Sequence, residues 1–502
     1  MSRLHIPEAD RTTREELADA VASRLARGLR LALVAGHEDA DGSGFRVVYV
    51  FLGTADERCE LTVPVPTDDA WLPTLAGLSY QAGRFERELR DLYGIVPRDH
   101  PQPYRLVRHA HWPTGFHPML ADADPRPWFD GNAGFPFVEV TGKGIYEIPV
   151  GPVHAGLIEP GHFRFSVVGE TIVRMYQRLW FVHRGVEKLF SGRRPEDGIA
   201  LVERISGDTA VGHSLAFVMA VEDALGIAVP EPDRLVRALL LECERLYNHV
   251  NDLGAIVNDV GFGIVNQHAG RLREKLLRHN ARLTGHRLLR GAVRLGGASL
   301  LAPPDLELIA SVAAEVAELA AIATGSSLVA NRLDTTAVLL PDQAARLGVL
   351  GYVARASGVS VDARVEQPFV DLGPSFRVVT RETGDVRARF DVRAEEVAVS
   401  AAVIADLAAT HPRLVETVET PPVETPGQAP ELQAGLGVVE AWRGTLVHRV
   451  EVAPDGTLAR VKVVDPSFCN WPALGVALAD TIVPDFPLAN KSFNMSYAGN
   501  DL

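Results

Sequence analysis

The stretch DRLVRALLLECERLYNHVNDLGAIVND, residues 233–259, decides the fold class. Its apolar side chains recur every three or four residues, which is the period of an amphipathic α-helix. The recurring positions are Leu235, Leu239, Cys243, Leu246, Val250, Leu253 and Val257. A helix of this length is too long for a small domain, so the stretch predicts a helical bundle.

Further segments extend the bundle and add strands. The helical period returns in 265–291, 304–325 and 395–411. The segment 163–181 predicts a strand hairpin that turns at Gly169 and Glu170, and 445–465 predicts a second hairpin that turns at 454–456. The Pro- and Glu-rich stretch 415–431 is typical of a flexible excursion.

The N-terminal part has a different pattern. Residues 1–96 predict a small α+β domain, with helices over 13–29 and 84–95 and strands over 46–53 and 59–66. Residues 97–137 are rich in Pro, His and aromatic residues and have no period, so they predict a linker laid over a surface. We expect an α+β fold class, with the bundle and peripheral antiparallel strands in a second domain, 138–502.

Composition excludes several classes of protein. The 502 residues are 47% hydrophobic and 23% charged, which is ordinary for a globular chain. The net charge of −14 argues against a nucleic-acid partner, because phosphate binding relies on Lys and Arg. Neither a signal peptide nor a long apolar run is present, so we expect a soluble, intracellular chain. The three cysteines, Cys59, Cys243 and Cys469, form no CxxC pair and predict neither disulfides nor a sulfur-bound cluster in this chain.

Several blocks of the chain resemble subunits of membrane-bound redox complexes. FERELRDLYGI, residues 85–95, resembles the C-type (30 kDa) subunit of respiratory complex I. The blocks 147–170, 182–193, 203–217 and 465–502 resemble the large subunit of group 4 energy-converting nickel-iron (NiFe) hydrogenases, the hydrogenase-4 and formate hydrogenlyase type. Those hydrogenases share ancestry with the D-type (49 kDa) subunit of complex I. The chain is therefore identified as a member of this superfamily in which the two subunits are fused, 138–502 being the hydrogenase-like domain.

The resemblance implies the place of a metal site and its loss. In such hydrogenases two cysteine pairs hold nickel and iron, in motifs that correspond here to RISGDT and DPSFCN. The ligand positions fall on Ser206, Thr209, Ser467 and Asn470. Neutral hydroxyl and amide groups cannot replace soft, charged thiolates, so we expect no metal in this chain and no hydrogenase activity. Thirty-two residues follow Asn470, and they resemble the uncleaved ending of relatives, so no removable tail is expected.

The same residues are also compatible with ordinary structural roles. Ser206, Thr209 and Asn470 taken singly are typical of polar residues that cap helices. His213 is equally compatible with a structural role, and the linker histidines His100, His109, His111 and His117 favour interface packing over zinc binding.

Candidate cavity or proton-relay residues are His154, Arg204, Asp208, His213 and Asp465. His154 lies in a Gly/Pro turn, where complex I relatives place a loop that reaches into the quinone cavity. Asp208 lies between two ligand positions, with Arg204 as a possible partner for a carboxylate; an N-cap role for Asp208 is equally plausible. Relatives that react with quinone hold its head group with a histidine and a tyrosine, but residues 204–213 contain no tyrosine.

The resemblance also implies partners and two function classes. No cofactor is expected in this chain, 4Fe-4S clusters are expected in partner subunits, and quinone and NAD binding are possible in the complex. The implied partners are the B-type iron-sulfur small subunit, a ferredoxin-like subunit, and membrane-embedded antiporter-like and H-type subunits. These partners would hold the chain at the cytoplasmic face of the membrane. The chain is then either an electron-transfer subunit that acts on a quinone-type substrate, or a structural or coupling subunit without chemistry of its own.

Overall fold

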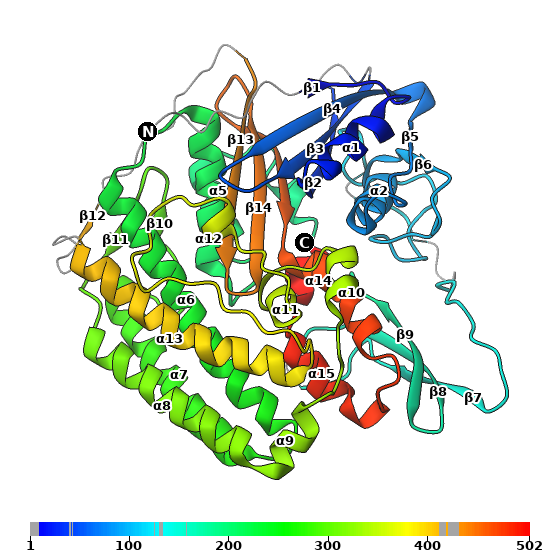
Figure 1. Cartoon of the computed structure of the whole chain (residues 1–502). Helices are drawn as coiled ribbons and strands as arrows, with labels where there is room; N and C mark the ends of the chain where they lie inside the picture. Colours follow the sequence, from blue (N-terminus) through cyan, green and yellow to red (C-terminus); the bar gives the residue numbers. More distant parts are fainter. Residues whose placement is uncertain are drawn as a thin grey trace.

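The computed structural model describes residues 10–39, 42, 44–124, 126–129, 134–156, 158–410, 418–419 and 431–502. A helical bundle and an N-terminal α+β unit lie on either side of a central three-stranded sheet (Figure 1). Of the predicted excursion 415–431, only strand β12 (Val418–Glu419) and residue 431 are described.

The bundle is built around the predicted long helix. Helix α6 covers Glu231–Asn258 and packs against α7 and α13, while α13 also packs against α8 (Figure 1). All seven apolar positions that recur in α6 are buried, which confirms the helical period. The other bundle helices are α7 (Gly263–Thr284), α8 (Leu306–Gly325) and α13 (Val386–Thr410).

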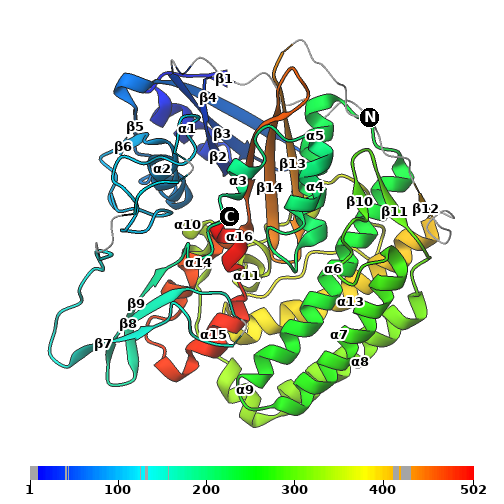
Figure 2. The ribbon, with the colours of Figure 1, turned by 180° about the vertical axis from the view of Figure 1, so that it is seen from behind.

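The central sheet is an antiparallel meander of β13 (Gln433–Ala441), β14 (Gly444–Val452) and β15 (Leu458–Val464). Helix α5 (Ala210–Leu225) covers one of its faces (Figure 2). A Cβ atom at Gly437 would lie 1.8 Å from the carbonyl oxygen of Ala216, and one at Gly435 would lie 2.1 Å from that of Ala220. Glycine at these two positions therefore lets the helix and strand backbones touch, which fixes the start of α5 beside the β13–β14 turn.

The α+β fold class is confirmed, with one difference in the placing of strands. The sheet of β7 (Ile145–Val150), β8 (His162–Val168) and β9 (Thr171–Arg178) is peripheral, and its second hairpin turns at Gly169 and Glu170 as predicted. The β13–β15 sheet, in contrast, is almost wholly buried. Its β14–β15 hairpin, predicted to be peripheral, lies in the core because both the bundle and the N-terminal unit pack on this sheet.

The N-terminal unit has a four-stranded sheet of order β1-β4-β3-β2, a two-stranded parallel sheet of β5 and β6, and two helices. Its elements are β1 (Asp10–Arg11), α1 (Leu17–Ala26), β2 (Arg30–Glu38), β3 (Gly44–Leu52), β4 (Arg58–Pro66), β5 (Trp71–Pro73), α2 (Tyr80–Tyr93) and β6 (Val96–Arg98). Strand β2 was not predicted.

One buried and one partly buried ion pair connect this unit to the central sheet. Arg449 on β14 donates to both carboxylate oxygens of Glu60 at 3.0 and 3.1 Å. Arg46 on β3 donates to both oxygens of Glu451 at 2.9 Å each. Paired guanidinium and carboxylate groups offset each other's desolvation only in such bidentate geometry, so these contacts fix how the two units meet.

The remaining short elements connect and close the two units. They are α3 (Val186–Leu189), α4 (Pro195–Val202), β10 (Val293–Arg294), β11 (Gly297–Leu300), α9 (Ser327–Leu333), α10 (Pro341–Leu347), α11 (Gly351–Ala356), α12 (Ala363–Glu366), α14 (Pro466–Ala477), α15 (Phe486–Phe493) and α16 (Tyr497–Asp501).

The linker 97–137 is anchored on α2 by one buried carboxylate. Asp91 Oδ2 accepts hydrogen bonds from the backbone N–H groups of Leu106, Val107 and Arg108 at 2.8, 2.8 and 3.1 Å. Ring nitrogens of the linker histidines His100, His109 and His117 lie within hydrogen-bond distance of the backbone carbonyls of residues 83, 179 and 91. These contacts agree with a linker laid over a surface and with packing roles for the three histidines.

We predict that Asp91→Ala destabilises the chain by about 3 kcal/mol, because three buried N–H groups lose their acceptor. Urea-induced unfolding measures this, and limited proteolysis should cut first within 97–127. Asp122→Ala, which changes an exposed aspartate of the same linker, is the control and should shift stability by less than about 0.5 kcal/mol. Equal stability of the two variants would contradict the anchoring role.

Candidate functional site

The first pair of implied ligand positions lies in the turn between α4 and α5. Ser206 donates its hydroxyl to Asp208 Oδ1 at 2.9 Å, and the Oγ atoms of Ser206 and Ser496 lie 2.8 Å apart. Thr209 donates to the same Asp208 oxygen at 3.1 Å and accepts from Trp442 Nε1 at 3.1 Å. Both side chains are buried, and each hydroxyl group has at least two polar partners in the protein.

The second pair lies at the start of α14 and is equally engaged. Ser467 Oγ accepts from the backbone N–H of Ser496 at 2.9 Å. Asn470 Oδ1 accepts from the N–H of Leu350 at 2.8 Å, and its Nδ2 donates to the carbonyl of the same residue at 3.1 Å. Ser496 therefore connects Ser206 with Ser467, and the fourth position is satisfied by backbone alone.

Arg443 occupies the centre of this arrangement. Its two terminal nitrogens donate to the two oxygens of Asp208 at 2.7 Å each, and its Nε donates to the carbonyl of Asn494 at 2.7 Å. Burial alone would raise the pKa of Asp208, but the charge of Arg443 and the hydrogen bonds that it, Ser206 and Thr209 donate outweigh this and lower the pKa to about 2. Asp208 is therefore ionised and paired at neutral pH.

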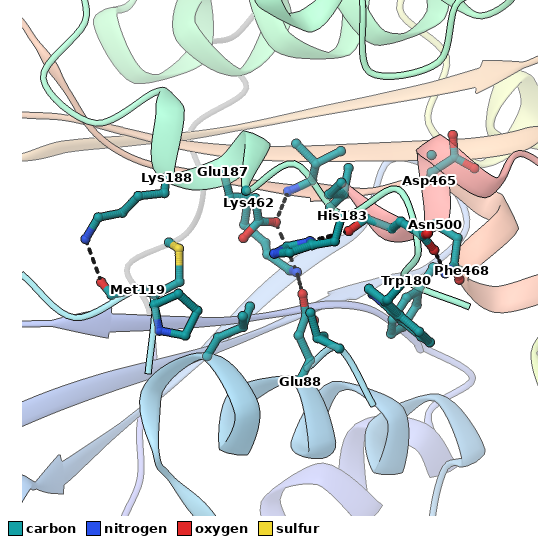
Figure 3. Close-up of a pocket in the computed structure, with 18 of the residues that line it drawn as sticks. Glu88, Met119, Trp180, His183, Glu187, Lys188, Lys462, Asp465, Phe468 and Asn500 are labelled. Carbon is teal, nitrogen blue, oxygen red and sulfur yellow. Dashed lines mark hydrogen bonds and ion pairs between the residues drawn. The ribbon is translucent and has the colours of Figure 1, made fainter. Parts of the chain in front are cut away.

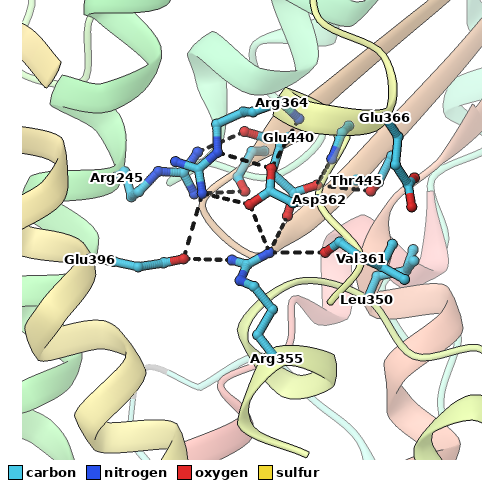
Figure 4. Close-up of polar contacts among 12 residues, drawn as sticks. Arg245, Leu350, Arg355, Val361, Asp362, Arg364, Glu366, Glu396, Glu440 and Thr445 are labelled. Atoms are coloured by element: carbon cyan, nitrogen blue, oxygen red, sulfur yellow. Dashed lines mark hydrogen bonds and ion pairs between the residues drawn. The ribbon is translucent and has the colours of Figure 1, made fainter. Parts of the chain in front are cut away.

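The turn that carries Arg443 is held by a buried cluster of charges (Figure 4). Arg245 on α6 donates to the carbonyls of Glu440 and Ala441 at 2.8 and 3.1 Å. Arg355 on α11 donates to the Glu440 carboxylate at 2.8 Å. These bonds fix the end of β13. They therefore hold the backbone next to Arg443 in place independently of the contacts that the Arg443 side chain makes.

A second buried line of polar groups starts at Asp465. Asp465 Oδ1 caps α14 by accepting from the N–H of Ser467 at 2.7 Å, while its Oδ2 lies 3.1 Å from His213 Nε2. His213 Nδ1 lies 3.1 Å from His448 Nε2. Burial, together with the neighbouring His213, lowers the pKa of His448 well below its usual value. Two of the predicted relay residues, His213 and Asp465, are thus brought together, with His448 as a third member.

Asp465 also lies on the wall of a pocket between α2, the segment 180–188, β15 and the C-terminal helices (Figure 3). The pocket has about 560 Å³ of empty space, including its open mouth. Lys462 lies between two carboxylates there, 2.6 Å from Glu88 and 3.1 Å from Glu187. Burial raises the pKa of Asp501, a further lining residue, to about 6. The pocket thus offers ionisable groups beside the Asp465 line.

His154 lies apart from this pocket and has an aromatic partner. Its Nδ1 accepts from the N–H of Ala155 at 2.9 Å, so the neutral ring carries its proton on Nε2. That nitrogen lies 3.4 Å from the hydroxyl of Tyr497. Burial raises the pKa of Tyr497, so its hydroxyl keeps the proton. Residue 497, and not the segment 204–213, therefore supplies a tyrosine beside His154.

Two arrangements that the sequence left open, a carboxylate pairing of Arg204 and an N-cap role for Asp208, are not observed. Arg204 is exposed and donates to the carbonyl of Ala200, so the guanidinium that pairs with Asp208 belongs to Arg443. The N-cap position of α5 is Thr209, with no capping bond from its side chain, so Asp208 does not cap this helix. The bidentate ion pair provides a stronger interaction than a single capping bond.

Sequence reasoning missed four residues of the site: Arg443, His448, Ser496 and Tyr497. His448 interrupts the apolar strand β14, and Arg443 lies in the buried turn between β13 and β14. A titratable side chain in a buried segment is a signal that it has a partner. Ser496 and Tyr497 carry no such signal, because they are the N-cap and the first residue of the short helix α16.

The residues at the four positions do not fit a nickel-iron centre. Hydroxyl and amide groups are hard, neutral donors, and each of them is already bonded to protein. Burial raises the pKa of Cys469 to about 12, so its sulfur stays a thiol and not the thiolate that binds metal. Within the described ranges, no group of three or more His, Cys, Asp or Glu side chains could hold a metal ion.

Comparisons with known proteins match both parts of the chain. The 30 kDa subunit of respiratory-chain NADH dehydrogenase matches residues 9–127, and its 49 kDa subunit matches 259–501. The nickel-dependent hydrogenase family matches 184–252. Hydrogenase-4 component G of Escherichia coli is 32% identical over 94% of this chain and 83% of its own length. The chain belongs to the hydrogenase-4 component G family.

Other members and structures agree with this assignment. Formate hydrogenlyase subunit 5 of Escherichia coli is 32% identical over 94% of this chain and 84% of its own length. In a structure of the membrane-bound sulfane sulfur reductase, an archaeal respiratory membrane complex, one chain has the same fold. It has a TM-score of 0.64 and 23% identity and covers 72% of this chain and 100% of its own length. This family member is thus a fusion of 30 kDa-type and 49 kDa-type domains.

No helix in the described part is long and apolar enough to cross a bilayer.

The lowered pKa of Asp208 predicts how its contribution to stability depends on pH. A carboxyl whose pKa falls on folding, here from 3.8 to about 2, stabilises the fold above its unfolded pKa. This stabilisation is lost as the pH falls through the folded value. Asp208→Asn should therefore be less stable than the native chain by a constant amount between about pH 5 and pH 8, and the difference should shrink below about pH 4. Thermal unfolding across this range measures it; a difference that does not change with pH would contradict the ion pair.

Proposed function

We propose that the chain is the large subunit of a membrane-associated redox complex that exchanges electrons with a quinone-type substrate and has no nickel-iron centre. Electrons would arrive through 4Fe-4S clusters of the B-type small subunit and a ferredoxin-like subunit. Antiporter-like and H-type membrane subunits would hold the chain at the cytoplasmic face. Membership of the hydrogenase-4 component G family supports this setting.

The pair formed by His154 and Tyr497 carries the proposal. A quinone carbonyl needs a positioned donor, and reduction adds two electrons to the ring and one proton to each oxygen. The Tyr497 hydroxyl oxygen, at the start of α16, lies 3.4 Å from His154 Nε2 in the loop after β7. His154 is half-buried beside Val153, which is 89% exposed, whereas Tyr497 is buried, so a head group would approach the pair from the His154 side.

The buried ionisable groups fit the same role. Protons taken up by a substrate must be replaced from the protein or from water. The line Asp465–His213–His448 and the neighbouring pocket place several titratable groups inside the chain, which an inert scaffold does not need. They support proton exchange during turnover.

The second candidate is a non-catalytic structural or coupling subunit. One observation favours it: the side chains at all four implied ligand positions are hydrogen-bonded to other groups of the chain. In that role the chain would transmit contacts between electron-carrying and membrane partners without binding a substrate.

Quinone reduction by the purified complex separates the two candidates. We predict that His154→Ala and Tyr497→Phe each lower the rate with a soluble quinone analogue by about 10²-fold, because each removes a donor to the carbonyl. His268→Ala, which changes an exposed histidine on α7, is the matched control and should leave the rate unchanged. Equal rates in all variants, or no quinone reduction at all, would favour the coupling subunit.

A further inference from the structure

We propose that the 206–209 turn and Arg443 form a binding site for one small carboxylate, and that the Asp208 side chain fills this site as an internal ligand. The Asp208 carboxylate receives four hydrogen bonds from three side chains. Two come from Arg443 at 2.7 Å, one from Ser206 at 2.9 Å and one from Thr209 at 3.1 Å. A planar guanidinium facing both oxygens, with hydroxyl donors beside it, matches the geometry of a carboxylate.

The donors are held by groups other than Asp208. The Arg443 guanidinium lies over the Trp442 ring, 3.9 Å from its centroid, and Nε is bonded to the carbonyl of Asn494. Thr209 is bonded to Trp442 Nε1, and Ser206 to Ser496. Removing the Asp208 carboxylate therefore leaves the donor set in place.

The backbone of the turn is also fixed without the carboxylate. The carbonyl oxygen of Asp208 accepts hydrogen bonds from Tyr247, Asn248 and Trp442 at 3.2, 2.8 and 3.0 Å. A substitution at residue 208 keeps all three bonds, since they involve only the main chain. The vacated space should therefore persist in the variant.

The charge of Arg443 and the exposure of the Asp208 side chain to solvent also favour the binding of an anion. Arg443 is 6% exposed and keeps its charge, so it requires an anion. The other carboxylate near it, Asp465, is bonded to His213 and to the N–H of Ser467. The Asp208 side chain is 39% exposed, so an anion from solvent can reach the position that it occupies.

The size of the ligand follows from the atoms that Asp208 contributes. Asp208→Ala removes one carboxylate group, and formate replaces it without an additional carbon. Acetate carries a methyl group that would meet the alanine Cβ. The variant should thus prefer formate to acetate, whereas the native site, being filled, should respond to neither.

The test is thermal unfolding of the full chain, with any partner subunits that co-purify, in sodium formate, acetate or chloride at equal ionic strength. We expect the Tm of Asp208→Ala to lie below the native value and to rise with formate in a saturable way, with a smaller rise in acetate. The native chain should give the same Tm in all three salts. The double variant Asp208→Ala/Arg443→Gln should lose the formate response.

Equal Tm values of Asp208→Ala in formate and chloride would overturn the proposal, as would an equal formate response in the double variant. If purified Asp208→Ala does not fold in chloride, soluble yield from cells grown and lysed with formate or chloride makes the same comparison. A higher yield with formate supports the site, and equal yields overturn it.

Discussion

The buried guanidinium of Arg443 is the group on which the charge balance of the site depends. A guanidinium cannot lose its charge at any accessible pH, and burying it is costly unless an anion faces it. Asp208 provides that anion with both oxygens at 2.7 Å. Ser206 and Thr209 then donate to the same carboxylate, so two of the implied metal-ligand positions become part of one hydrogen-bond network with the arginine.

This network connects parts of the chain that are distant in sequence. Ser496 joins Ser206 to Ser467, and Arg443 reaches the carbonyl of Asn494. The turn before α5, the β13–β14 turn, the start of α14 and the turn before α16 are therefore held together. Arg245 and Arg355 support the same region from the bundle side (Figure 4). Polar contacts within the chain thus fix four segments where related hydrogenases are expected to use a metal.

Much of the fold could be predicted because its pattern is local. Helix α6 repeats its apolar period over many turns, and the β14–β15 hairpin has a recognisable turn at 454–456. Strand β13 was missed because Gly435 and Gly437 interrupt its alternation, although these glycines are what seat α5 against it. Strand β2 is almost wholly buried, so its apolar side chains do not alternate with polar ones.

The site could be predicted only in part, because only some of its residues belong to local sequence motifs. The four positions without sulfur follow from the two motifs, and so do Asp208, His213 and Asp465. Their partners do not, since Arg443 is 235 residues from Asp208 and His448 is 235 residues from His213. No local pattern reports contacts of that kind, and Tyr497 meets His154 across an even longer separation. The motifs therefore predicted where the site lies. The residues that balance its charges could be identified only from the three-dimensional structure.

We propose that hydrogen-bonded side chains occupy the positions at which related hydrogenases hold nickel and iron. The most direct measurement is the nickel content of the purified complex, taken together with iron and acid-labile sulfide. The account predicts nickel far below one atom per chain, alongside iron and sulfide from the partner subunits. One nickel atom per chain would contradict it.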